Sequence, residues 1–193
     1  MSINIFKLNS ASIGYPTIQS GALPRGYFSE FFNGEPLPES WEPPPFEIKR
    51  AKAKLPDIIA WKEYLPLLSK KAVELFRDIA PDCAEYREFV SIRGESYCAV
   101  NVLAKENILD LDRSEVTHLV DGRIRSVNRY VFKSDHVQCP VFKLSNMLDG
   151  PIFVTRRLAQ ATLDAGLVGF QFRDPAVNET ALLFSGADVN AFP

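Results

Sequence analysis

The clearest periodic pattern of apolar residues runs from Lys70 to Ile79. Four apolar side chains recur at positions i, i+3, i+4 and i+7 and therefore share one face of a helix: Ala72, Leu75, Phe76 and Ile79. Ser69 is a favourable N-cap before this run, and Pro81 cannot continue a helix after it. The pattern predicts a helix over residues 70–79.

A second helix is predicted from Arg156 to Ala165. Thr155 is a suitable N-cap, and Gly166 can adopt the left-handed conformation that ends many helices. The segment GFQF that follows returns as a last short strand, and CPVFKL at residues 139–144 predicts another.

Two β-hairpins are predicted between these helices. EYREFVSI and SYCAVNVLA flank Arg93–Gly94–Glu95, and SEVTHLV and RIRSVNRYVF flank Asp121–Gly122. Asp-Gly between two β-branched runs is typical of a type I′ turn, because both central residues of that turn need a positive φ. Hairpins with two separated helices indicate an α+β fold with mainly antiparallel strand pairing.

Composition divides the chain into three parts. Residues 1–48 are rich in Pro, Gly, Ser and aromatic residues without clear periodicity, so we expect an irregular segment with one or two short strands, packed on the body. Phe46–Lys49 alternates apolar and charged residues, which predicts a strand entering that body. Residues 49–173 are expected to form the α+β domain, and residues 174–193 a weakly patterned tail.

The stretch GEPLPESWEPPPFEIK, residues 34–49, places one tryptophan, Trp41, among five prolines. Prolines fix φ and reduce the entropy lost when a loop is ordered, so we expect this stretch to be a structural brace that holds Trp41 against the sheet. The alternative, a polyproline ligand for an SH3-like groove, needs a more exposed and isolated segment.

The same region is acidic. From Ser29 to Ile48 there are five acidic residues and no Lys or Arg. The simpler interpretation is a solvated loop whose aromatic residues pack under the body. The alternative is a surface that steers toward a basic protein partner, in which acidic side chains raise the association rate. The candidates for partner contact are Glu35, Glu39 and Glu42.

Composition predicts an ordinary soluble globule, with 46% hydrophobic and 24% charged residues. The net charge of −2 gives no general reason to expect a nucleic acid or an anionic membrane as partner. The N-terminus has no secretory pattern, and the longest apolar runs are four residues, as at Ile58–Trp61, too short for a membrane span. Three cysteines without CxxC spacing, Cys83, Cys98 and Cys139, fit reduced and mostly buried thiols. These features predict a cytoplasmic protein.

No motif for catalysis, metal or cofactor binding is present, so we expect no enzyme, no metal and no cofactor. Neither His118 nor His136 has a carboxylate or cysteine at ligand spacing. Asp110 and Asp112 begin a calcium-like pattern that lacks its glycine and its bidentate glutamate, so they are expected to cap a turn. Glu85 and Glu88 are interpreted as solvated surface. The alternatives are a small enzyme built around His118 or the Asp110–Asp112 pair, or a scaffold or adaptor protein.

Several stretches, in this order, resemble immunity family eleven of bacterial polymorphic toxin systems. They are NGEPLPESWEPP, the aspartate of LPDII, PLLSKKAVELF, SYCAVNVLAKENILDLDRSEV, DGRI…RYVF, VFKLSN, PIFVTRRLAQ and GLVGFQF, and they cover about residues 31–173. The resemblance does not account for the longer N-terminus or for the tail after Arg173.

The resemblance implies an inhibitor without catalytic residues, which protects a bacterium and its kin by binding a toxin, often one delivered by type VI secretion. Because no signal directs the chain elsewhere, that toxin is expected to act in the cytoplasm. A nuclease is the first choice, since its basic substrate cleft suits an acidic inhibitor. The alternative docking place is the sheet or a hairpin turn, for example near Asp121–Gly122. The oligomeric state is left open.

Overall fold

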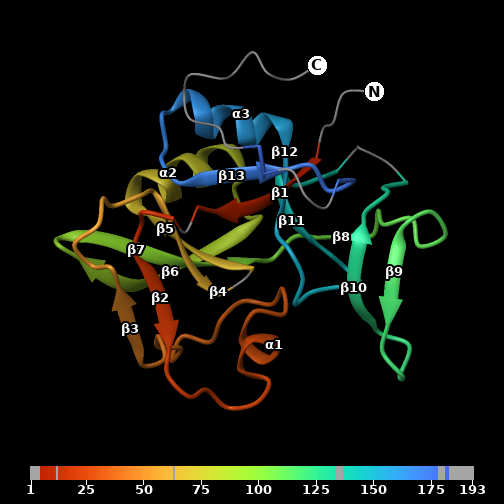
Figure 1. The fold of residues 1–193 in the computed structure, drawn as a ribbon, viewed down its shortest axis with the longest axis horizontal. Helices are drawn as coiled ribbons and strands as arrows, with labels where there is room; N and C mark the ends of the chain where they lie inside the picture. The colour runs from red at the N-terminus through yellow and green to blue at the C-terminus, as the bar shows by residue number, and fades with distance from the viewer. Residues whose placement is uncertain (1–4, 12, 63, 134–136, 178–180, 183–193) are drawn as a thin grey trace.

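The computed structural model describes residues 5–11, 13–62, 64–133, 137–177 and 181–182. Figure 1 shows an α+β fold, as predicted, in which strands dominate and two main helices pack together on one side. Every strand pair is antiparallel except β11 with β8. The fold class is therefore confirmed.

Two larger sheets form the body. The six-stranded sheet has the order β14 (Ala181–Leu182), β13 (Phe170–Arg173), β1 (Ile5–Ser10), β12 (Phe153–Thr155), β11 (Val141–Leu144) and β8 (Lys105–Glu106). The four-stranded sheet has the order β4 (Ile58–Lys62), β5 (Leu65–Ser69), β7 (Glu95–Val102) and β6 (Ala84–Ile92). The first strand of the chain thus lies inside the larger sheet, between β12 and β13.

Two small sheets complete the β structure. One pairs β2 (Thr17–Ser20) with β3 (Phe46–Lys49), and β2 also contacts β4 of the body. The other pairs β9 (Glu115–His118) with β10 (Ile124–Arg129) and lies at one end of the molecule (Figure 1). The short helix α1 (Tyr27–Phe31) lies between β2 and β3 in the chain.

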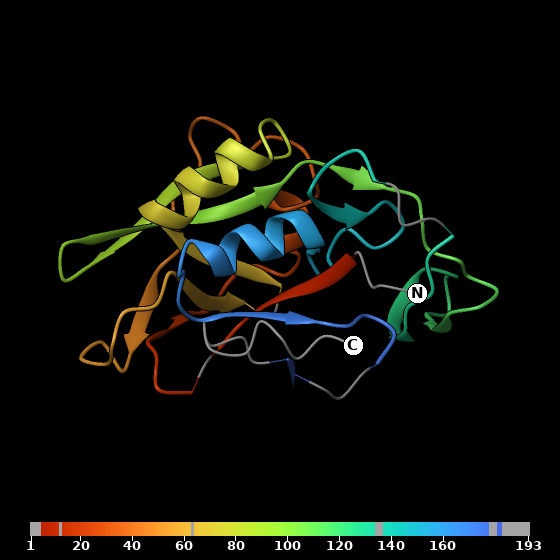
Figure 2. The same ribbon diagram turned by 90° about the horizontal axis from the view of Figure 1, so that it is seen from above.

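Both predicted helices are confirmed, and they lie side by side (Figure 2). Helix α2 (Lys70–Ile79) begins where Ser69 Oγ accepts a hydrogen bond from Ala72 N at 3.3 Å. Helix α3 (Arg156–Asp164) is followed by Gly166 with φ 64°. Their apolar faces enter the main core between the helices and the sheets, with Phe76 and Leu158 fully buried.

The predicted hairpins form, but the turn at Asp121–Gly122 differs from the prediction. At Asp121–Gly122 only Gly122 has a positive φ, 84°, and Gly122 N donates to Leu119 O at 3.0 Å. The type I′ prediction is therefore wrong for this turn, which is longer and uses one left-handed glycine. The other hairpin has positive φ at both Arg93 (53°) and Gly94 (88°). It therefore has the two-residue geometry that matches the twist of its strands.

The prediction of three reduced thiols is also wrong. Cys83, directly before β6, and Cys139, two residues before β11, form a disulfide with their Cα atoms 5.9 Å apart. Cys98 on β7 is free and half-buried. No spacing motif could indicate this bond, because the fold brings together cysteines 56 residues apart.

Candidate functional site

The acidic loop, residues 33–45, is held against the four-stranded sheet by polar side chains. Asn101 of β7 is fully buried, and its Nδ2 donates to Glu35 O at 2.7 Å and to Glu85 Oε1 at 2.8 Å. Glu85 Oε1 also accepts a hydrogen bond from Leu37 N. A buried carboxamide and a half-buried carboxylate thus fix the backbone where the loop begins.

Arg87 extends this contact along β6. Its guanidinium donates to Leu37 O at 3.1 Å and to Pro38 O at 2.9 Å. Trp41 N then donates to Pro38 O at 2.9 Å, which closes a turn. Glu85 therefore binds the loop and is not the solvated carboxylate that the sequence predicted, whereas Glu88 is exposed.

Trp41 lies under this loop and retains 9% of its surface exposed. Its Nε1 donates to Tyr27 Oη at 3.1 Å. Its ring lies edge-on to Phe32 at 5.9 Å between centroids, and 6.5 Å from the ring of Phe89 on β6. The tryptophan therefore joins α1, the loop and the sheet through one aromatic cluster, which also contains Trp61.

The three candidate glutamates lie on the outer side of the loop. All three are exposed, and 67% of the Glu35 side chain is accessible. Glu35 nevertheless forms an ion pair with Lys105 of β8. Glu39 and Glu42 pair with no basic side chain in the described part of the chain. The ion pair with Lys105 was not predicted from the sequence, because Lys105 lies 70 residues from Glu35.

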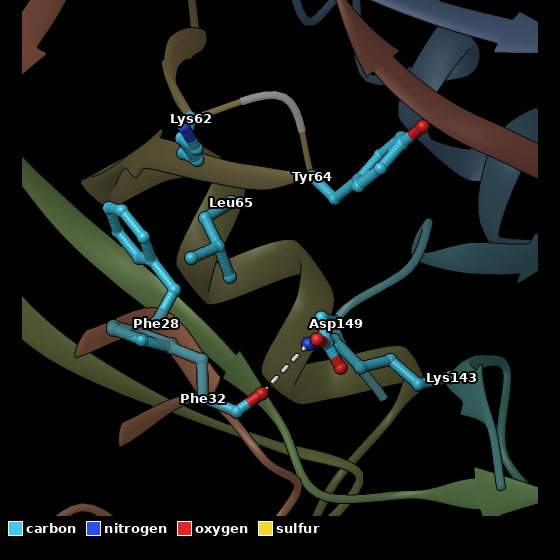
Figure 3. A pocket seen from close by; sticks show the side chains of 7 residues that line it. All are labelled: Phe28, Phe32, Lys62, Tyr64, Leu65, Lys143 and Asp149. Atoms are coloured by element: carbon cyan, nitrogen blue, oxygen red, sulfur yellow. Dashed lines mark hydrogen bonds between the residues drawn. The ribbon is translucent and has the colours of Figure 1, made fainter. Parts of the chain in front are cut away.

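An apolar pocket of about 180 Å³ opens beside the start of the acidic loop (Figure 3). It is lined by Phe28, Phe32, Lys62, Tyr64, Leu65, Lys143 and Asp149. Lys143 of β11 is fully buried and donates to Phe32 O at 3.0 Å and Leu148 O at 2.7 Å. Burial lowers the pKa of Lys143 to about 8, and Asp149 opposes part of this shift. Lys143 thus ties the end of α1 to the segment after β11. No pattern in the sequence indicates this role of Lys143.

The other candidates do not converge. His118 is exposed, and its Nδ1 lies 3.1 Å from Gly122 O, while His136 lies outside the described residues. Asp110 Oδ1 accepts a hydrogen bond from Arg113 N at 3.1 Å, so Asp110 caps a turn as predicted; Asp112 is exposed. Where the structure describes the chain, no three His, Cys, Asp or Glu side chains gather as a metal site.

We therefore expect the purified protein to contain no stoichiometric metal. A chelator destabilises a protein only when it removes a metal that contributes to folding. We therefore expect a chelator to leave the thermal unfolding curve of this protein unchanged. Elemental analysis before and after dialysis against the chelator provides the control. A bound ion lost together with a fall in melting temperature would contradict this prediction.

These observations define a small α+β protein that presents a rigidly held acidic loop beside an apolar pocket. Among the helices of the described residues, none has both the length and the apolar character to cross a membrane. The sequence of residues 14–177 matches the family model of the immunity protein family Imm11. The chain belongs to this family, which confirms the resemblance found in the sequence. A search of curated proteins finds no match.

Proposed function

We propose that the chain binds a cognate bacterial toxin and neutralises it without chemistry of its own. Membership of an immunity protein family carries this proposal, because the match extends over residues 14–177. The rigid acidic loop adds a surface suited to a protein partner. Ordering a loop before binding lowers the entropy lost in the complex, and here Asn101, Glu85 and Arg87 supply that order.

The toxin that we propose is a nuclease that acts in the cytoplasm and is delivered by type VI secretion. A nuclease carries a basic cleft for its substrate, and exposed carboxylates such as Glu39 and Glu42 complement such a cleft. The disulfide bears directly on the compartment in which the chain acts. The Cys83–Cys139 disulfide is typical of oxidising compartments, whereas thiols are kept reduced in the cytoplasm.

Co-expression tests the function. The product of the neighbouring gene is taken as the candidate toxin, and it is induced in a host cell with and without the chain while growth is recorded. We expect growth only when the chain is present in the cytoplasm, and retention of the toxin on the tagged chain. Protection only after export to the periplasm would contradict the cytoplasmic proposal. A folded His118→Ala variant should still protect.

Reversal of Glu35, Glu39 and Glu42 to Lys should slow toxin association several-fold at low salt, with a smaller effect on dissociation. The side chains are exposed, so the fold should survive. The difference should shrink as salt rises, because the screening length is only about 10 Å at 0.1 M. Surface plasmon resonance at several ionic strengths measures both rates.

The matched control reverses Glu74, Asp78 and Glu88 to Lys, three residues that are exposed on α2 and β6. It changes the net charge by the same amount as the acidic-loop variant. This control should retain most of the parent association rate. Equal association rates for the acidic-loop variant and the parent at low salt would remove the acidic loop from the interface.

A further inference from the structure

Each strand of the β9–β10 ribbon has one edge without a partner strand among the described residues. Within the described residues β9 and β10 pair only with each other. The ribbon lies at one end of the body in both views (Figures 1 and 2), and at its tip Val120 is fully exposed. An unpaired strand edge presents backbone N–H and C=O groups that can pair with another chain.

A groove of about 430 Å³ runs along β10. Its lining residues are Tyr64, Leu119, Arg123, Ile124, Arg125, Ser126, Asn146, Met147, Leu148, Asp149 and Gly150. One wall is thus four consecutive residues of the ribbon, and the other is five consecutive residues after β11. Arg123 precedes β10, and the pairing of β10 with β9 is irregular between Ile124 and Ser126, so the regular alternation of side chains is interrupted there. The groove therefore lies between the irregular start of β10 and the segment after β11.

The opposite wall is fixed, and part of its backbone is already paired. Met147 N donates to Leu144 O at 3.0 Å, and Gly150 N donates to Met147 O at 2.9 Å. Leu148 O accepts from the buried Lys143. Of the two walls, β10 is the one that offers a strand edge to an incoming chain.

The charged residues that line the groove are two arginines, Arg123 and Arg125, and one carboxylate, Asp149. Arg123 is paired with Asp121 at 2.7 Å, whereas Arg125 is exposed and forms no ion pair with a described residue. The groove also shares Tyr64 and Asp149 with the apolar pocket, so the two spaces adjoin. An extended chain on β10 would therefore meet an unpaired guanidinium and an apolar pocket.

We propose that the β10 groove binds an extended segment of the cognate toxin, which adds as a strand to β10. A carboxylate side chain of that segment pairs with Arg125, and a large apolar side chain enters the apolar pocket. The proposal rests on the proposed function and specifies where the toxin binds. It also places a second contact near the acidic loop, because Phe32 lines the pocket one residue before that loop begins.

Hydrogen–deuterium exchange of the full chain, alone and with the candidate toxin, tests strand addition. Backbone amides in residues 124–128 and 146–150 should exchange more slowly in the complex. A complex that forms while exchange in both segments stays unchanged would overturn the groove assignment but not the proposed function. If no complex forms, both are overturned.

Two variants test the groove directly. Arg125→Glu reverses the charge in the groove, and Ser126→Trp fills the groove with a large side chain. Each variant should weaken toxin binding about tenfold or more. The control is Arg113→Glu, which makes the same charge change at an exposed position that does not line the groove. It should bind within about twofold of the parent. Parent-like affinity of both groove variants, with unfolding curves like the parent's, would overturn the proposal.

Discussion

Trp41→Ala should lower the free energy of unfolding by about 3–5 kcal/mol, the range for truncating a buried large aromatic residue. Trp41 contacts Phe32 and Phe89 and donates from Nε1 to Tyr27 Oη, so its removal opens a cavity in the aromatic cluster and removes the apolar contact between the loop and the sheet. For a chain of this length the melting temperature should fall by about 6–20 °C. Urea denaturation followed by circular dichroism measures the change.

Two variants separate packing from other effects. Trp41→Phe keeps an aromatic ring but loses the hydrogen bond to Tyr27. It should lower the free energy of unfolding by less than the alanine variant does. Glu42→Ala changes the exposed neighbour and should alter stability by no more than about 0.5 kcal/mol. A Trp41→Ala protein with the parent unfolding curve but weakened toxin binding would make Trp41 an interface anchor and not a brace.

Loss of the Cys83–Cys139 disulfide should lower the free energy of unfolding by about 2–4 kcal/mol. The bond closes a long loop, because its two cysteines are 56 positions apart in the sequence, and it therefore restricts the unfolded chain. The disulfide also links the residue before β6 of the four-stranded sheet to the segment before β11 of the six-stranded sheet. It therefore connects the two larger sheets. Denaturation of the parent with and without reductant measures the effect, and the Cys83→Ala, Cys139→Ala double variant should match the reduced parent.

Cys98→Ala is the control, because Cys98 takes no part in the disulfide. Reductant should destabilise this variant as much as it destabilises the parent. Equal stability of the parent in oxidised and reduced form would contradict the prediction. Alkylation of protein taken from cells, followed by mass spectrometry, then shows whether the bond forms in the cytoplasm or only after export.

The elements that the sequence predicted well are those whose signals are local. The helix from Lys70 carries its cap, its apolar face and its stop within a dozen residues, and the structure agrees at both ends. The hairpins were equally visible, but the turn geometry was not. Arg93 adopts a positive φ that an arginine rarely takes, because the pairing of β6 with β7 on either side holds it there.

The candidate site depends on contacts that no local pattern reveals. Glu85 and Arg87 bind the acidic loop from 48 to 50 residues away, and Asn101 binds it from 66 residues away. In the sequence these are ordinary polar residues of a hairpin. Composition did indicate the acidic, proline-rich loop itself. That β10 pairs with only one strand among the described residues is seen in the fold and not in the sequence.

Titration of toxin activity distinguishes neutralisation by binding from catalytic inactivation of the toxin. A fixed amount of the candidate toxin is incubated with increasing amounts of the purified chain, and its remaining activity is measured. We predict that inhibition is complete once the chain matches the toxin in stoichiometric amount, is independent of incubation time, and is reversed when the complex is dissociated. Toxin that stays active in excess chain, or that is progressively inactivated by substoichiometric chain, would contradict the account.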